Sequence, residues 1–145
     1  MFLLVVINLS LAQTTGKQFN VDGSGVAIDG YDPVSYFISQ KPVKGKKEFS
    51  LLEHGIIYQF ASQKNENMFR SDPAKYEPQY GGWCAYAMGF SGNKVEVDPE
   101  TFKILSGKLY LFYNKFFNNT LKSWNKNEAN LKNKADANWL KIIHQ

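Results

Sequence analysis

Hydrophobic and polar residues alternate in two pairs of short segments. Residues 49–52 and 56–60 form the first pair, and residues 102–105 and 108–113 form the second. A two-residue period is typical of strands, and a short glycine-containing turn between two such segments predicts a β-hairpin. In the last segment, odd-numbered residues from Leu109 should face one side and even-numbered residues from Tyr110 the other.

Near the C-terminus the hydrophobic period lengthens to three or four residues, which is typical of amphipathic helices. The first helix should begin at a capping Asn114. Leu131, Ala135 and Trp139 should share one face of a second, terminal helix. The pair is expected to pack back on the strands, and the apolar face of its first helix should comprise Phe117, Leu121 and Trp124.

Shorter helices are predicted where a capping residue precedes an apolar cluster. Asp32 before Pro33 predicts a helix start, Ser62 predicts another, and a small-residue helix is expected from Trp83 to Met88. The predicted fold class is therefore α+β: a small antiparallel sheet from two hairpins, covered by helices, with a C-terminal helical pair. A single domain should span residues 25–143.

The N-terminus predicts export. Residues 2–12 form an apolar stretch that is too short for the roughly 20 residues of a membrane-spanning helix. Its length suits the apolar region of a signal peptide, and Ser10 and Ala12 place small residues before a cut at Gln13. We therefore predict a signal peptide at 1–12, a flexible lead-in at 13–24, and a periplasmic or secreted product. The alternative is a buried N-terminal strand.

Composition excludes several chemistries. One Cys and two His leave no multi-thiolate or three-histidine zinc site within one chain. Phosphate-binding and dinucleotide-binding glycine motifs are absent. The formal net charge is +4, and residues 114–145 hold six Lys against two acidic residues. Arg70 is the single Arg, which argues against nucleic-acid recognition and favours a solvated basic face.

Several motifs together resemble a YHS domain, in the longer exported branch of that family. The resemblance covers roughly residues 25–141. It implies a small metal-associated domain, which in this branch is linked to copper and has no assigned activity. The matching segments are GYDPVSYF at 30–37, YQFAS at 58–62 followed by Asn65, Phe69, Asp72-Pro73 and Tyr76, YGGWCAYAM at 80–88, Asp98-Pro99, GKLYL at 107–111, Trp124, and ADANW at 135–139.

One part of the family pattern is missing. Many members carry Cys at the positions of Ala61 and Asn65. A methyl group and a neutral amide cannot replace two thiolates at a soft-metal site. The metal inference is therefore not transferred to these two positions.

Soft-metal chemistry would instead require Cys84. Met88 lies four residues later, on the same face of a helix, and a thiolate with a thioether suits Cu(I). His54 could supply a third ligand. The alternative is that both sulfurs are core packing, which is common for Cys and Met. Cys–His catalysis with His54 is a further alternative, but the chain is not expected to be an enzyme.

A small-ligand cleft is also expected near the cysteine. Tyr80, Trp83 and Tyr86 have apolar bodies and polar tips that can line a shallow site. Gly81-Gly82 would allow close backbone approach to a ligand or to another segment. The sequence thus predicts an exported, non-enzymatic protein that binds copper or a small ligand near Cys84. The alternative is a structural or protein-interaction module without a ligand.

Overall fold

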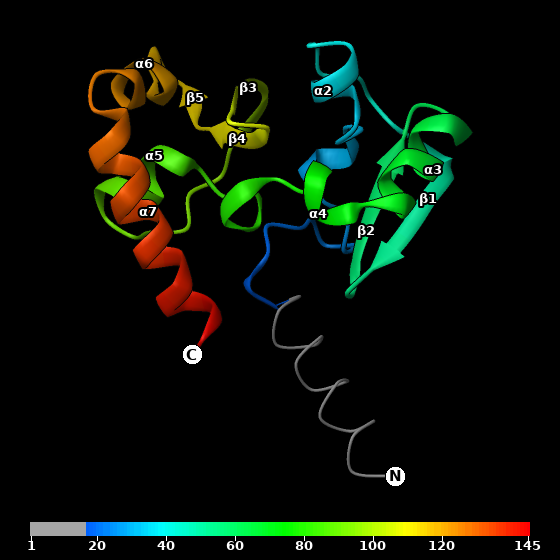
Figure 1. The fold of residues 1–145 in the computed structure, drawn as a ribbon, viewed down its shortest axis with the longest axis horizontal. Helices are drawn as coiled ribbons and strands as arrows, with labels where there is room; N and C mark the ends of the chain where they lie inside the picture. The colour runs from blue at the N-terminus through cyan, green and yellow to red at the C-terminus, as the bar shows by residue number, and fades with distance from the viewer. Residues whose placement is uncertain (1–16) are drawn as a thin grey trace, which may run out of the picture.

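The computed structural model describes residues 17–145, so the predicted signal peptide and residues 13–16 of the lead-in lie outside the described residues. Two groups of elements stand side by side (Figure 1). The first contains η1 (Ile28–Gly30), α2 (Ser35–Ile38), β1 (Lys46–Glu53), β2 (Ile56–Phe60), α3 (Gln63–Ser71) and α4 (Pro73–Tyr76). The second contains η2 (Gln79–Gly82), α5 (Ala85–Phe90), β3 (Asp98–Leu105), β4 (Lys108–Phe112), β5 (Asn114–Lys115), β6 (Asn118–Asn119), α6 (Thr120–Asn125) and α7 (Glu128–Ile143).

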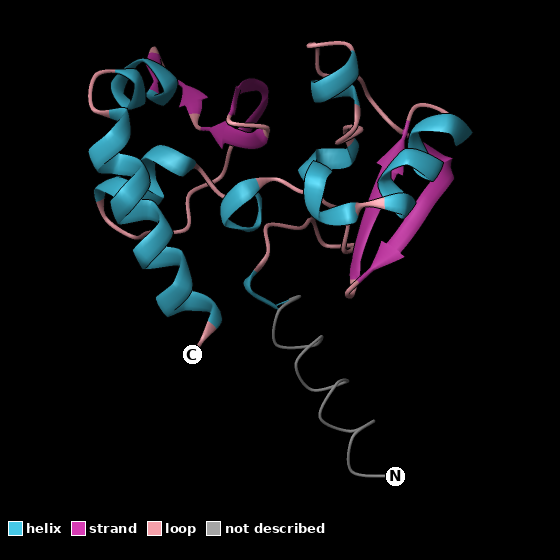
Figure 2. Ribbon diagram, viewed as in Figure 1, coloured by secondary structure: helices cyan, strands magenta, loops and turns pink. Residues whose placement is uncertain are grey.

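The predicted α+β class is confirmed, and both predicted hairpins are present (Figure 2). They are antiparallel, with Leu51 opposite Tyr58 in the first and Lys103 opposite Tyr110 in the second. The hairpins form separate two-stranded sheets rather than one sheet. Within residues 17–145, an isolated bridge extends each hairpin, from Val26 to Ile57 in the first and from Pro78 to Leu109 in the second.

Strand β4 separates two hydrophobic cores. Leu109 and Leu111 pack into the core that contains β2 and α3, whereas Tyr110 and Phe112 pack against Trp124 in the core under α7. The predicted alternation of faces is confirmed. Because both faces of β4 are buried, one strand joins the two groups of elements into a continuous packed unit.

Local capping places several helices as predicted. The Ser62 side chain accepts a hydrogen bond from the backbone N–H of Asn65 and begins α3. Asp32 accepts one from Val34, although α2 itself begins at Ser35. In α7, Leu131 and Ala135 are buried as expected. Helix α5 lies close against α7 because Gly89 faces the backbone of Leu131, where a Cβ atom would collide.

The prediction of a helix beginning at a capping Asn114 is wrong. Residues 114–119 form the small β5–β6 hairpin, and Asn119 caps α6 by accepting from Leu121 N–H at 3.1 Å. Phe116 and Phe117 both have positive φ, 53° and 61°, which no α-helix tolerates. Phe117 is therefore a turn residue rather than part of a buried helical face. The helix predicted over 83–88 also shifts, to Ala85–Phe90.

Candidate functional site

Cys84 is completely buried and belongs to the core around β2. Its Sγ accepts the backbone N–H of Tyr113 at 3.3 Å and lies 3.5 Å from the Thr120 hydroxyl. That hydroxyl donates to the Tyr113 carbonyl at 2.7 Å, so the thiol can donate to the Thr120 oxygen. The thiol thus joins the residue before α5 to the residue after β4 and to the first residue of α6.

The three predicted metal ligands do not meet. Met88 is fully buried, but it packs in the other core, with Trp124. Cys84 precedes α5 as its N-cap, with φ −57° and ψ 118°, so the helical spacing to Met88 does not apply. His54 lies in the turn between β1 and β2, with a 69% exposed side chain 3.6 Å from Glu53. The structure therefore favours the packing alternative for both sulfurs.

The predicted aromatic ligand residues are largely used in packing. The Tyr80 hydroxyl donates to Asp136 at 2.7 Å, and burial raises the pKa of Tyr80 well above its usual value. Trp83 donates to the Gln18 carbonyl at 2.7 Å, and the Tyr86 ring stacks on Phe90. Tyr80 lines a cavity of about 280 Å³ between α4 and α7.

The backbone at Gly81 makes its predicted close approach to another segment of the chain and not to a ligand. A Cβ atom there would lie 2.6 Å from the ring of Trp139. Both Tyr80 and Gly81 have positive φ, so this turn bends the chain tightly under α7. Glycine is required because a side chain would displace Trp139.

A buried carboxylate lies between the end of β2 and the start of α3. Asp32 Oδ2 accepts hydrogen bonds from the Ala61 backbone N–H at 2.9 Å and from Asn65 Nδ2 at 2.7 Å. Its Oδ1 accepts from Val34 N–H at 2.8 Å. Ala61 and Asn65 therefore both donate to one carboxylate. The sequence indicated only the helix-capping role of Asp32.

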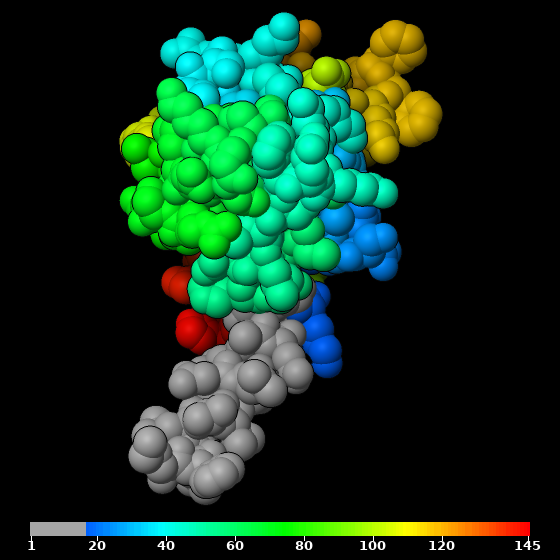
Figure 3. Space-filling view, turned by 90° about the vertical axis from the view of Figure 1, so that its right-hand side faces the viewer, coloured from blue at the N-terminus to red at the C-terminus, as the bar shows by residue number. Residues whose placement is uncertain are grey.

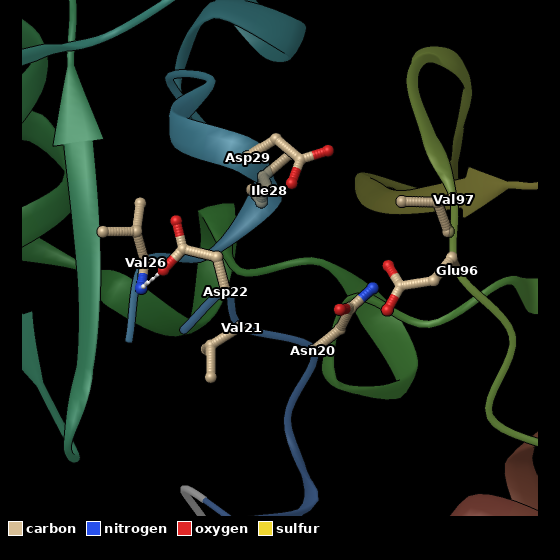
Figure 4. A pocket seen from close by; sticks show the side chains of 8 residues that line it. All are labelled: Asn20, Val21, Asp22, Val26, Ile28, Asp29, Glu96 and Val97. Carbon is tan, nitrogen blue, oxygen red and sulfur yellow. Dashed lines mark hydrogen bonds between the residues drawn. The ribbon is translucent and has the colours of Figure 1, made fainter. Parts of the chain in front are cut away.

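A second cavity, of about 220 Å³, lies between the lead-in and the segment before β3 (Figure 4). Val26, Ile28 and Val97 are buried and form its apolar floor. Asp29 and Glu96 extend toward the space between the two segments, and Asn20 points toward Glu96 (Figure 4). The lining residues are Asn20, Val21, Asp22, Val26, Ile28, Asp29, Glu96 and Val97.

The rim of this cavity is acidic. Asp22 accepts the backbone N–H groups of Val26, at 3.0 Å, and Ser24, at 2.8 Å. These bonds, with that from Val26 the strongest, hold the pKa of Asp22 below its usual value, so the carboxylate stays charged. Neither Lys nor Arg is among the lining residues. The cavity lining therefore contains three carboxylates over an apolar floor: those of Asp29 and Glu96 face the space between the two segments, and that of Asp22 turns toward the Val26 backbone N–H (Figure 4).

The negative potential extends to Tyr31 on the same face. Desolvation is the main cause that raises the pKa of Tyr31, and Glu100, Asp98 and Asp29 raise it further. Lys44 lies over the Tyr31 ring, 4.8 Å from its centroid. Its ammonium group also donates to the Asp29 backbone carbonyl at 2.6 Å. One of the chain's own ammonium groups thus already rests beside this acidic face.

Backbone conformation shapes the rim. Ile28 and Asp29 both have positive φ, 56° and 49°, and Gly30 continues the left-handed turn. This conformation is costly for a β-branched residue such as Ile28. It turns the Ile28 side chain into the floor and leaves Asp29 exposed. The sequence did not indicate this site, because its carboxylates come from segments about 70 residues apart, and a left-handed isoleucine has no sequence signal.

Across residues 17–145, His, Cys, Asp and Glu side chains nowhere converge in a group of three that could hold a metal ion. No helix in that same range is both long and apolar enough to cross a bilayer. Comparisons with protein-family models, curated proteins and solved structures found no match to this chain.

Proposed function

We propose that this chain is a non-enzymatic binding module whose acidic cavity takes an alkylammonium group, from a small amine or from the lysine-type end of a larger ligand. The observation that carries the proposal is the charge of the cavity. Asp29 and Glu96 face the space over an apolar floor, Asp22 adds a third carboxylate to the lining, and the lining contains no basic residue. An alkyl chain can rest on the valines and the isoleucine while its ammonium group faces the carboxylates.

The dimensions favour a small group. Pockets for drug-sized ligands typically measure about 300–1,000 Å³, and this cavity is smaller. The carboxylates are spread around the rim rather than converging on one point. That arrangement suits a cation with several N–H donors better than a single metal ion. The soft-metal prediction at Cys84 receives no support, because the Cys84 and Met88 side chains are buried and pack in different cores. The predictions of a YHS-type domain and of export stay predictions from the sequence.

The test is an NMR titration of the full chain with n-butylammonium chloride, with n-butanol as the uncharged ligand of similar shape. We expect shifts at Asn20, Val26 and Val97 with the amine and not with the alcohol. Added salt should weaken binding because the carboxylates are exposed.

Two substitutions isolate the charge. Asp29→Asn keeps a residue that tolerates positive φ, and Glu96→Gln keeps the side-chain shape. The double variant should bind the amine about two- to thirtyfold more weakly, since each of the two surface charge pairs contributes roughly 0.2–1 kcal/mol. The matched control is Glu48→Gln, an exposed carboxylate on β1 outside the cavity. Equal binding of butanol, or an unchanged affinity in the double variant, would contradict the proposal.

A further inference from the structure

Two phenylalanines form the tip of the β5–β6 hairpin. Lys115 pairs with Asn118, which leaves Phe116 and Phe117 as the two turn residues. Phe116 is 88% exposed and Phe117 is fully exposed. The segment around this hairpin, gold in Figure 3, projects from the body of the molecule. Neither ring belongs to the two hydrophobic cores or their partly buried neighbours.

The turn holds these rings at a conformational cost. Both residues have positive φ, as a type I′ turn requires, and this turn strongly prefers Asn-Gly. Bulky aromatic residues are poor choices for the left-handed region. The strain and the exposed apolar surface both oppose stability. Within residues 17–145, packing of these rings does not offset that cost, because neither ring belongs to a hydrophobic core.

The charges around the tip are positive. Three lysines are exposed there: Lys115 on the hairpin, Lys122 on α6 and Lys126 directly after α6. The nearest following carboxylate, Glu128, is paired with Lys103. An acidic residue lies near the base of the hairpin, where Asn114 donates to Thr101, which in turn donates to Asp98. Glu100 directly precedes Thr101 in the chain, and its side chain is exposed.

We propose that the Phe116-Phe117 tip inserts into the interfacial region of an anionic lipid bilayer, with the three lysines against the headgroups. Aromatic side chains favour the membrane–water interface, and lysines near the surface of an anionic leaflet add attraction. A convex, protruding apolar tip needs no complementary cavity in a fluid interface. A protein partner would have to offer a pocket for two adjacent rings, so the shape favours the bilayer. This proposal is independent of the acidic cavity.

The test is co-sedimentation of the full chain with vesicles of phosphatidylcholine alone and with equal parts of phosphatidylcholine and phosphatidylglycerol. The informative variant combines Phe116→Asn with Phe117→Gly, the pair that type I′ turns prefer. We expect its partition to anionic vesicles to fall at least about tenfold, because two aromatic rings leave the interface. Its thermal midpoint should stay unchanged or rise, which a structural role for the rings would not allow.

A matched control removes apolar surface elsewhere. Leu52→Asn lies on β1 and replaces a side chain that is 67% exposed, and its partition should match that of the unsubstituted chain. Lys115→Gln and Lys122→Gln should each weaken binding to the anionic vesicles by roughly fivefold and leave binding to neutral vesicles unchanged.

A local readout keeps the test independent of the apolar N-terminal residues. In a Phe117→Trp variant, brominated lipids should quench the added tryptophan emission if the tip inserts. Unchanged partition of the Asn-Gly variant, or absence of extra quenching in Phe117→Trp, would overturn the proposal. A dimer that the Asn-Gly variant abolishes, without quenching, would also overturn it and assign the tip to a second copy of the chain.

Discussion

Replacing Asp32 tests whether one buried carboxylate organises the first core. Its side chain is fully buried and accepts from Val34 and Ala61 N–H groups and from Asn65 Nδ2, at 2.7–2.9 Å. These bonds tie the segment before α2 to the end of β2 and to α3. Asp32→Ala would leave all three donors without their acceptor.

The expected magnitude follows from those three bonds. A buried donor left unsatisfied costs about 1–3 kcal/mol, and Ala61 is partly accessible to water, which lowers its share. We therefore expect Asp32→Ala to reduce the free energy of unfolding by about 4 kcal/mol, a large part of the roughly 5–15 kcal/mol typical of a domain. Asp32→Asn should cost about 2–3 kcal/mol, because one oxygen still accepts from Val34 while the new amide faces two donors.

Urea unfolding followed by far-UV circular dichroism measures these differences. The matched control is Asp72→Asn: Asp72 also precedes a proline but is exposed and makes no capping bond, so the change should stay within about 0.5 kcal/mol. Asn65→Ala combined with Asp32→Asn should cost less than the sum of the single changes, because they share a bond. Equal stability of the Asp32→Asn and Asp72→Asn variants would refute the reasoning.

Four other predictions concern separate parts of the chain. The buried Cys84 thiol should resist iodoacetamide until the protein unfolds, and rapid labelling in native buffer would contradict its placement in the core. The Tyr58 hydroxyl is buried and has no hydrogen-bond partner among residues 17–145, so Tyr58→Phe should leave the unfolding free energy unchanged or raise it by up to about 1 kcal/mol; a clear loss would reveal a missed partner. Burial raises the pKa of Glu77 above its usual 4.5, so the native state loses stability as the pH rises from 4.5 through the raised pKa. The Glu77→Gln variant should therefore be more stable than the unsubstituted chain at pH 7 and equally stable at pH 4. Urea midpoints that show no such difference between the two pH values would argue against this. Mass spectrometry of the exported protein should show an N-terminus at Gln13, whereas intact Met1 in cytoplasmic material would contradict the signal-peptide prediction.

The sequence predicted correctly the elements that are stabilised by interactions between residues close together in the chain. The two hairpins follow from a two-residue hydrophobic period around glycine turns, and Ser62 begins α3 because its side chain satisfies a nearby N–H. The opposite faces of β4 were likewise readable from alternation. What alternation could not show is that both faces are buried, because that depends on α7 returning to cover the second one.

Local spacing misled where the backbone leaves regular geometry. Cys84 and Met88 share a helical face only if both lie within the helix, and Cys84 is a non-helical cap whose thiol is used by Tyr113 and Thr120. Phe117 fits a helical period but adopts a left-handed turn with Phe116. In both cases the backbone conformation depends on contacts and strand pairings with residues outside the local hydrophobic pattern.

The two proposed binding surfaces came from tertiary structure alone. Asp22 and Glu96 are distant in the chain and share a cavity only because the lead-in crosses the segment before β3. The exposure of Phe116 depends on which side chains the two cores enclose. The spacing of hydrophobic residues shows which side of a segment is buried. Which residues bury that side, and which surface stays exposed, depends on the long-range packing of the whole chain.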